Sequence, residues 1–356
     1  MDETKSRLLD ELPEPLVKPG PSVETGRPRA APEATAEVIR PGRPESECEE
    51  GSRVILPHGL DTPSDASSDL ELAGSAADDL QALQSSSKLN VRVPHSARVW
   101  NYWLGGKDNF PVDRKVGDQI CEVFPDMALT ARADRAFLCR AVRYLAGEAR
   151  VDQFLDIGTG LPTADNTHEV AQRVAPQSRI VYVDNDPLVL AHARALLTSS
   201  PQGVTDYLDA DLHEPDTIIA GAAKTLDLTR PVAVMLLGIA HFILDDDEAQ
   251  AIVQRLMDAV PPGSYLVINH ATTEITPEAT SAGIAHWNQF GEPEMTARSP
   301  RQIAGFFQGL ELLEPGVVSC SRWRPDPSPR GEPAEVDEFC AVARKPDATC
   351  SPNSGA

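Results

Sequence analysis

The sequence has few aromatic residues, and they are unevenly distributed. Phe, Trp and Tyr make up 5% of the 356 residues, and residues 1–90 contain none of them. A segment that lacks large apolar side chains and is rich in Pro, Glu, Asp and Ser cannot bury enough surface to offset its ordering entropy. We therefore predict a disordered acidic leader over 1–90, a folded domain over 91–345 and a flexible tail over 346–356.

Long hydrophobic runs and metal-binding cysteine patterns are also missing. No apolar run approaches the roughly 20 residues of a membrane helix, and the charged N-terminus has no signal-peptide core. The six cysteines are scattered without Cys-x-x-Cys spacing, which argues against a zinc site and a disulfide framework and favours reduced thiols. We expect a cytoplasmic protein without a metal and without a membrane association.

Positive charge is scarce. The chain has 32 Lys and Arg against 54 Asp and Glu, for a net charge of -22. General binding to nucleic acid requires clustered basic residues that attract phosphates. The composition therefore argues against a nucleic-acid partner, although it allows a local basic pocket.

The most informative motif is a glycine-containing turn between two apolar runs. D-I-G-T-G at 156–160 follows an apolar run over 151–155, and a second run over 180–183 leads into Asp184. A strand, a glycine turn, a helix, a second strand and an acidic residue form a βαβ unit that grips a ribose-bearing cofactor. The carboxylate of Asp184 suits a ribose because it can accept hydrogen bonds from both hydroxyls.

The glycine pattern favours S-adenosylmethionine over a dinucleotide. A dinucleotide fingerprint needs a third small residue, where the helix packs on the strand and its N-terminus faces pyrophosphate. Here Gly158 and Gly160 are followed by Thr163 at that place, and Pro162 removes a backbone N–H that a phosphate would use. Asp156 precedes the turn, where a carboxylate repels phosphate and attracts an ammonium group. The alternative is an ordinary glycine turn of an α/β protein.

Strand and helix patterns alternate after residue 90, which predicts an α/β fold. Apolar strands are expected at 153–157, 179–183, 205–208, 231–237, 265–268, 312–318 and 339–343. Helices are expected at 116–124, 131–145 and 187–197, and after the N-cap residues Asn166, Asp245 and Ser299. The last two strands follow each other directly, so one of them must be antiparallel at a sheet edge. We predict a Rossmann-like class I methyltransferase fold with a mostly parallel seven-stranded sheet and an antiparallel last strand.

Several long motifs resemble those of one family. They are SARVWNYWLGGKDNF at 96–110, FLDIGTGLPT at 154–163, NTHEVAQ at 166–172, VYVDNDP at 181–187, RPVAVMLLG at 230–238 and WRP at 323–325. Over about residues 92–345 the chain resembles the actinobacterial S-adenosylmethionine-dependent methyltransferase family formerly catalogued as domain of unknown function 574. The resemblance implies a Rossmann-like domain that binds S-adenosylmethionine, but it does not identify the methyl acceptor. His241 and the long leader depart from the family pattern.

Cofactor-binding residues are expected after the first four strands. They are Asp156, Gly158, Thr159 and Gly160 for the methionine moiety, Asp184 for the ribose, Asn185, Asp211 and Leu212 for the adenine, and Leu237 and Gly238 beside the sulfonium.

An aromatic-flanked turn precedes the first strand. We predict that segment 100–110 closes over the cofactor, with Tyr102, Gly105, Gly106 and Asn109 in contact with it. Large side chains would anchor such a lid and the glycines would allow close backbone approach. The alternative is a cap that only packs on the core.

Methyl transfer is an in-line displacement, so the protein mainly positions the acceptor and, if needed, removes its proton. His241 and His270 follow the fourth and fifth strands, and either is a candidate general base, with a packing role as the alternative. Trp287, Phe290 and Met295 are expected to line a pocket for an apolar or aromatic small molecule.

Three functions remain open on the sequence alone. Transfer of a methyl group to a small-molecule acceptor is favoured. The acidic leader suggests a cofactor-binding regulator or partner protein without methyl transfer as the alternative. An NAD-dependent oxidoreductase is disfavoured because Thr163 breaks the dinucleotide pattern. Nothing in the sequence points to an oligomeric state.

Overall fold

The computed structural model describes residues 90–196, 198–329 and 331–347. The predicted leader therefore lies outside the described residues except for Asn90, and the predicted tail does so except for 346–347. Everything below concerns the described part of the chain.

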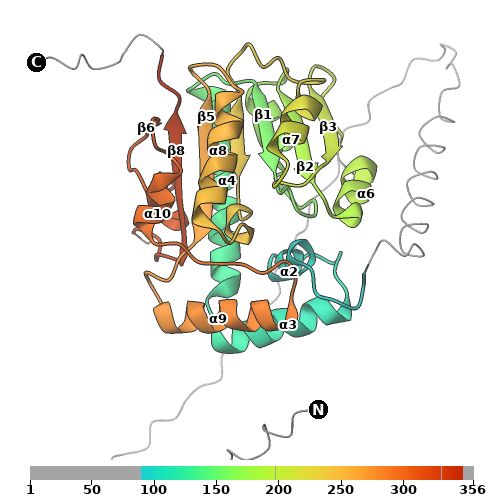
Figure 1. The fold of residues 1–356 in the computed structure, drawn as a ribbon, viewed down its shortest axis with the longest axis vertical. Coiled ribbons are helices and arrows are strands. Elements are labelled where there is room, and N and C mark those ends of the chain that lie inside the picture. The colour runs from blue at the N-terminus through green and yellow to red at the C-terminus, as the bar shows by residue number, and fades with distance from the viewer. Residues whose placement is uncertain (1–89, 197, 330, 348–356) are drawn as a thin grey trace, which may run out of the picture. The chain divides into compact units, whose positions relative to one another are not determined.

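An eight-stranded, mostly parallel sheet forms the centre of the fold (Figure 1). Its strands are β1 (Gln153–Ile157), β2 (Arg179–Asp184), β3 (Val204–Asp209), β4 (Ala233–Leu236), β5 (Tyr265–Ala271), β6 (Glu311–Leu312), β7 (Val318–Ser319) and β8 (Glu338–Arg344). The order is β3-β2-β1-β4-β5-β8-β6, with β7 also paired to β8. The first five strands are parallel, and β8 runs antiparallel to β5. This arrangement confirms the predicted topology.

One predicted strand is divided in two. The strand expected at 312–318 is present as β6 and β7, and both pieces pair with β8. Between them the N–H of Gly316, which has a φ of 86°, donates to the carbonyl of Leu313 at 2.8 Å. Pro315 has no N–H to donate. The turn interrupts the ladder, so the sheet has eight strands and not seven.

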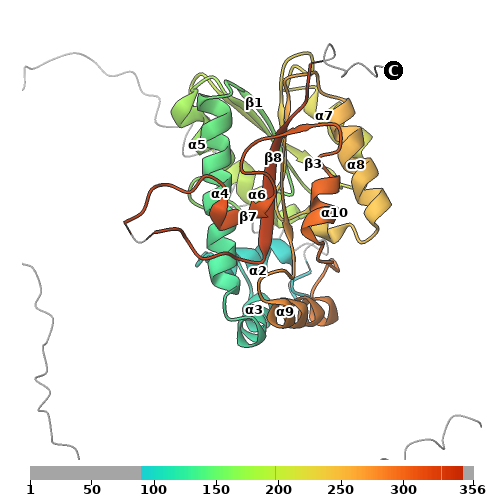
Figure 2. The same cartoon turned by 90° about the vertical axis from the view of Figure 1, so that its left-hand side faces the viewer.

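Helices cover both faces of the sheet, as Figure 2 shows from the side. They are α2 (Ser96–Trp103), α3 (Pro111–Val123), α4 (Met127–Gly147), α5 (Thr167–Val174), α6 (Pro187–Leu196), α7 (Pro215–Ala222), α8 (Asp246–Asp258), α9 (Pro277–Phe290) and α10 (Pro300–Gly305), with short 3-10 turns η1 (Ala240–Phe242) and η2 (Cys320–Arg322). α4 and α5 lie on one face, and α7, α8 and α10 lie on the other.

Alternate strand residues build two cores. Leu155 and Ile157 of β1 belong to the core under α7 and α8, whereas Phe154 belongs to the core under α4 and α5. All residues of β1, β4 and β5 are buried. Such runs are typical of parallel strands that are covered on both faces.

The three helix starts predicted from capping residues are confirmed by their capping bonds, whereas the helices predicted at 116–124 and 131–145 begin earlier, at Pro111 and Met127. Asn166 and Glu169 form a capping box at α5, and Ser299 and Gln302 form one at α10. At α8 the Asp245 side chain accepts a hydrogen bond from the backbone of the third residue that follows it. Because these bonds satisfy otherwise unpaired N–H groups, they fix where each helix begins.

A third and smaller core joins α2, α3 and α9 beyond the carboxyl ends of the parallel strands. Its buried members are Val99, Val116, Ile120, Phe124, Met127 and Trp287. This group of helices is the part of the fold that covers the candidate site.

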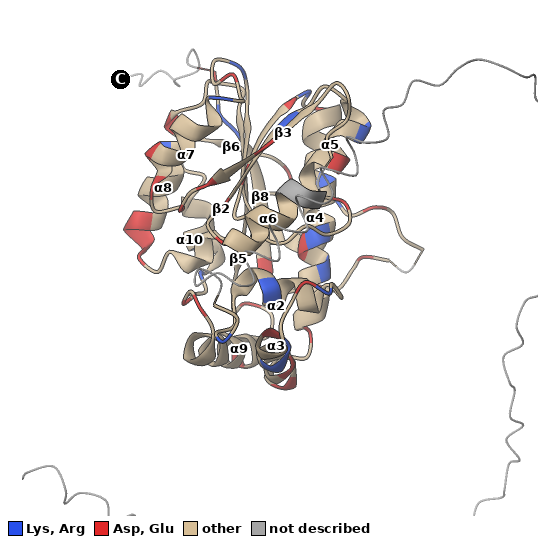
Figure 3. Cartoon of the chain, turned by 90° about the vertical axis from the view of Figure 1, so that its right-hand side faces the viewer, with Lys and Arg blue, Asp and Glu red and all other residues tan. Residues whose placement is uncertain are grey.

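Acidic residues occupy the first turn of α8, and Figure 3 shows several basic residues along α4 on the other side of the sheet. Within the described ranges, no helix is long and apolar enough to cross a membrane.

Candidate active site

A cavity of about 220 Å³ opens where the carboxyl ends of β1 to β4 face α2. Ligands of open α/β sheets bind at this edge. We call it the main cavity. Eleven sequence-predicted residues line it, namely Asp156, Gly158, Thr159, Gly160, Asp184, Asn185, Asp211, Leu212, Leu237, Gly238 and His241.

The glycine turn after β1 forms one wall of the main cavity. Gly158 and Gly160 have φ values of 75° and 66°, a region that side chains with a Cβ rarely adopt. A Cβ on Gly158 would lie 2.6 Å from the side chain of Ile239, whereas one on Gly160 would meet nothing within 4 Å. The turn is therefore shaped by backbone conformation at both positions and by a close neighbour at Gly158.

Asp184 ends β2 and faces the same space. Its Oδ2 accepts from the N–H of Gly160 at 2.9 Å, and its Oδ1 accepts from the N–H of Asp186 at 2.9 Å. Burial raises the pKa of the Asp184 carboxyl to about 6, although these backbone hydrogen bonds lower it. Each oxygen keeps a further lone pair. The carboxylate can therefore accept hydrogen bonds from two neighbouring hydroxyls.

Polar residues after β2 and β3 meet at the rim of the main cavity. The Asn185 amide donates to Asp211 Oδ2 at 3.0 Å, and the N–H of His213 donates to Asp211 Oδ1 at 2.9 Å. Burial alone would raise the pKa of Asp211, but the hydrogen bonds from His213 and Asn185 lower it overall. These residues form the polar border expected beside an adenine.

The opposite end of the main cavity carries two buried carboxyls. Asp156 Oδ2 accepts from the Thr167 hydroxyl at 2.6 Å, and burial raises the pKa of the Asp156 carboxyl. Asp134 of α4 also lines the cavity, and burial raises its pKa to about 6. Two carboxyls that are buried close together lose their hydrogen bonds to water. An ammonium group would replace these interactions, so the site favours a cationic ligand group.

Asp134 was not predicted, and its partner explains its position. The Asn269 amide of β5 donates to Asp134, and Asn269 Oδ1 accepts from the N–H of Gly238. This chain of contacts links α4, β5 and the loop after β4. One feature of the sequence could have indicated that Asp134 belongs to the site, because it is an acidic residue among the apolar positions of the predicted helix 131–145.

Segment 100–110 contributes residues to the wall of the main cavity that differ from the predicted ones. Trp100, Asn101 and Leu104 line the cavity. Tyr102 instead donates its hydroxyl to Asp118 of α3 at 2.5 Å. The reason is the helical spacing of α2: residues 97, 100, 101 and 104 share the face that lines the cavity, whereas Tyr102 lies on another face.

Of the predicted loop residues, Gly106 and Asn109 contact Asn101, while the N–H of Gly105 donates to the carbonyl of Tyr102. The N–H of Gly106 donates to the Asn101 carbonyl at 2.8 Å, and the Asn109 amide donates to Asn101 Oδ1 at 2.9 Å. A Cβ on Gly106 would lie 2.3 Å from the Asn101 amide, while Gly105 has a φ of 82°. These residues hold the shape of the loop behind Asn101, which itself borders the cavity.

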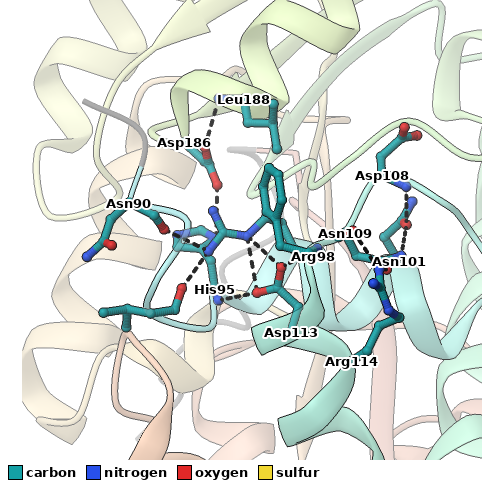
Figure 4. A network of polar contacts seen from close by, with 12 residues as sticks. Asn90, His95, Arg98, Asn101, Asp108, Asn109, Asp113, Arg114, Asp186 and Leu188 are labelled. Atoms are coloured by element: carbon teal, nitrogen blue, oxygen red, sulfur yellow. Dashed lines mark hydrogen bonds and ion pairs between the residues drawn. The ribbon is translucent and has the colours of Figure 1, made fainter. Parts of the chain in front are cut away.

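A polar network docks α2 against the ribose-side loop (Figure 4). Arg98 is 2% exposed, and its Nε donates to Asp113 of α3 at 3.2 Å. His95 Nδ1 lies 3.1 Å from Asp186 Oδ2, two residues after Asp184. Burial lowers the pKa of His95, although Asp186 raises it. The start of α2 is thus attached to the loop that carries the ribose-side carboxylate.

A second cavity of about 80 Å³ lies between α2, α3 and α9. Its wall is mostly apolar and includes Trp100, Trp103, Phe124, Trp287 and Met295, and it also contains the acidic residues Asp337 and Glu338. Of the three residues predicted to line an acceptor pocket, Trp287 and Met295 belong to this wall. Phe290 instead is 46% exposed, on the outer side of α9.

His241 belongs to the walls of both cavities. It is 4% exposed, and its Nδ1 has no hydrogen-bond partner among the described residues. Burial lowers the pKa of His241 well below its usual range, and the nearby His270 and Arg298 lower it further. Its imidazole is therefore neutral and has a free nitrogen.

His270 has a different environment from His241. Its Nε2 lies 2.8 Å from Nη1 of Arg298, and its Nδ1 lies 2.8 Å from the carbonyl of Ala271. A guanidinium only donates, so Nε2 accepts and Nδ1–H donates. Burial lowers the pKa of His270 to about 4. Both ring nitrogens are engaged in the packing of β5, and the structure does not bring His270 to either cavity wall in the described chain.

The residues of the main cavity fit S-adenosylmethionine. Asp184 offers acceptors for two ribose hydroxyls, and Asp134 with Asp156 offers negative charge for an ammonium group. The glycine turn at Gly158 allows the backbone to approach a ligand closely.

Comparison with known proteins points to the same cofactor. A family described as S-adenosyl methyltransferase matches residues 82–346. A domain of unknown function 574 protein from Streptomyces avermitilis is 43% identical, with a TM-score of 0.69 over 72% of this chain and 99% of that one. A candidate methyltransferase from Thermobifida fusca is 40% identical, with a TM-score of 0.66 over 71% and 96% of the two chains.

The chain also resembles a curated protein. That relative is a carboxy-S-adenosyl-L-methionine synthase from Trichlorobacter lovleyi, 26% identical over 172 residues, which are 47% of this chain and 65% of that protein. The match thus spans about two thirds of the relative's length. With the family match over most of the chain, these findings confirm the predicted fold, family and cofactor. The chain belongs to the S-adenosyl methyltransferase family, and S-adenosylmethionine is its cofactor.

Proposed function

We propose that this protein transfers the methyl group of S-adenosylmethionine to a small molecule bound in the second cavity. The observation that carries the proposal is His241, which belongs to the walls of both cavities. Ser96, Trp100 and Phe242 also line both cavities, so the cofactor space and the second cavity adjoin along these four residues. An acceptor in the second cavity would reach toward the main cavity past this imidazole.

The side chains of the main cavity have separate roles in this proposal. Bound S-adenosylmethionine supplies a methyl carbon that its sulfonium activates. Asp184 accepts the ribose hydroxyls, Asp134 and Asp156 compensate the ammonium charge, and Asn185 borders the adenine. Fixing the cofactor from both ends orients the reacting group, which is the main contribution that a protein can make to an in-line displacement.

The second cavity supplies the acceptor side. Its aromatic and aliphatic walls exclude water from the reacting atoms. The free Nδ1 of the neutral His241 imidazole can accept a proton from an acceptor hydroxyl or amine. The four cysteines of the described chain are free, which supports the proposed location in the reducing cytoplasm.

The test is a transfer assay with radiolabelled S-adenosylmethionine and fractionated extract of the source cells. We expect label in the low-molecular-weight fraction, and we expect Asp184→Ala and His241→Gln to reduce it. His286→Gln is the matched control, because His286 is a half-buried histidine of α9 that lines neither cavity. Label in protein or nucleic acid would contradict a small-molecule acceptor. Cofactor binding without any transfer would favour the regulatory alternative.

A further inference from the structure

Glu338 is a buried carboxyl that the cofactor site does not use. It is the first residue of β8, pairs with Ala271 at the end of β5, and is 3% exposed. It belongs to the wall of the second cavity, and its Oε1 has no hydrogen-bond partner among the described residues. A buried carboxyl without a partner costs free energy. A ligand with a hydrogen-bond donor would supply the missing partner.

The neighbours of Glu338 make this end of the cavity acidic. Asp337 lies beside it in the wall, and its carboxylate already accepts from the N–H groups of Ile275 and Thr276 at 2.8 and 2.9 Å. Burial, followed by the charges of Asp134 and Asp337, raises the pKa of Glu338 well above its usual range. No Lys or Arg is found among the described residues that line this cavity.

This charge pattern distinguishes three kinds of acceptor. A carboxylate or phenolate would bring negative charge toward Glu338 and Asp337, and no cation lines the cavity to compensate it. A neutral alcohol would supply a donor without any charge. An amine supplies N–H donors and can also carry positive charge, which the carboxyls and the faces of Trp100, Trp103 and Trp287 would stabilise.

Building on the proposed function, we infer that the acceptor is a small aromatic or alicyclic amine whose nitrogen binds at Glu338. An ammonium beside the Glu338 carboxyl favours its ionised form, because opposite charges stabilise each other. The bound ammonium then passes one proton to this carboxylate, whose pKa burial raises. The neutral nitrogen then attacks the methyl carbon, so that an N–C bond forms while the C–S bond breaks and its electron pair stays on sulfur. The product is an N-methylammonium, and positive charge has moved from sulfur to nitrogen. The acidic end of the cavity stabilises this charge as it develops.

Binding of matched ligands tests the inference. Benzylamine, benzyl alcohol and benzoate share one ring and differ in the polar group. Each is titrated into the full-length protein saturated with S-adenosylhomocysteine, and tryptophan fluorescence reports occupancy because three of the four tryptophans line the second cavity. We expect benzylamine to bind roughly tenfold more tightly than the other two ligands, the effect of one charge-assisted hydrogen bond.

The variant Glu338→Gln keeps the shape of the side chain and removes its charge. We expect it to abolish the preference for benzylamine while leaving S-adenosylhomocysteine affinity unchanged. Glu335→Gln, an exposed position three residues earlier, should behave as wild type. Preference of the wild type for benzoate or benzyl alcohol, no binding of benzylamine, or a preference retained in Glu338→Gln would overturn the inference. If Glu338→Gln does not fold, the relative affinities of the wild-type protein for the three ligands decide whether the inference holds. Failure of S-adenosylhomocysteine to bind would instead refute the proposed function.

Discussion

Replacing Asp184 with alanine should weaken S-adenosylmethionine binding by about 1–3 kcal/mol, or roughly 5- to 150-fold in Kd. The change removes both carboxylate oxygens at the carboxyl end of β2. Each oxygen already accepts one backbone N–H, from Gly160 or Asp186, and has a remaining lone pair for one ribose hydroxyl. The variant therefore loses two acceptors for the cofactor and two anchors of the loops that surround it.

The magnitude follows from these contacts. A hydrogen bond to a charged group contributes about 1.5–3 kcal/mol, but water solvates the ribose hydroxyls when the cofactor is free. The net loss for the pair is thus nearer to that of one such bond than of two. Asp184→Asn keeps one acceptor oxygen, so its loss should fall between those of the wild type and the alanine variant.

Isothermal titration calorimetry with S-adenosylhomocysteine measures these affinities directly. Asp209→Ala is the matched control, because Asp209 occupies the paired position on β3 and its side chain is exposed. We expect the control to bind as wild type does. An affinity in Asp184→Ala equal to that of the control would remove Asp184 from the ribose site.

Three further changes separate local effects. Gly158→Ala should abolish cofactor binding and lower the melting temperature more than Gly160→Ala does. Both variants place an alanine at a positive φ, which costs about 1–2 kcal/mol, but only the new Cβ at position 158 would lie 2.6 Å from the Ile239 side chain. Equal effects of the two variants would contradict this. Asp134 has a pKa raised to about 6 by burial, so its contribution to folding is favourable at pH values near 4 and is lost as pH rises through 6. Asp134→Asn should therefore stabilise the free protein by about 1–3 kcal/mol at pH 7.5, measured by urea unfolding, with little gain at pH 4. Asn101→Ala should weaken S-adenosylhomocysteine binding more than Tyr102→Ala, since the Asn101 side chain lines the main cavity; the reverse order in calorimetry would restore the original assignment of Tyr102.

Local sequence signals predicted many of the residues that line the main cavity. The turn at 156–160 and the acid at Asp184 are close to two apolar strands, and parallel strands present their carboxyl ends at one edge of the sheet. Capping residues such as Asn166 and Ser299 define helix starts through contacts within three residues. Where the determining contacts are this short in sequence, pattern and structure agree.

Other site residues depend on contacts between distant segments. Asp134 faces the main cavity because Asn269, 135 residues later, holds its carboxyl. Glu338 reaches the second cavity through the pairing of β8 with β5. Neither relation leaves a periodic signal in the sequence. The environment of Glu338 exists only after the sheet and the helical cover have assembled.

The helix α9 shows how packing overrides local preference. Its sequence, PEATSAGIAHWNQF, contains threonine, serine and glycine, which favour helices weakly. Gly283 lies against Ile120 and Phe124 of α3, with neighbouring atoms 3.5–3.7 Å from the position of a Cβ. A Cβ at this position would make ordinary van der Waals contact. The packing of α9 on α3 therefore supports a helix that its local sequence favours only weakly.

The central claim is that the main cavity binds S-adenosylmethionine through a ribose-gripping Asp184 and an acidic methionine end. Calorimetric titration of the full-length protein with S-adenosylmethionine, and separately with NAD, tests this claim most directly. The account predicts binding of one S-adenosylmethionine per chain and no measurable binding of NAD at the same concentrations. Tighter binding of NAD, or no binding of S-adenosylmethionine, would contradict it.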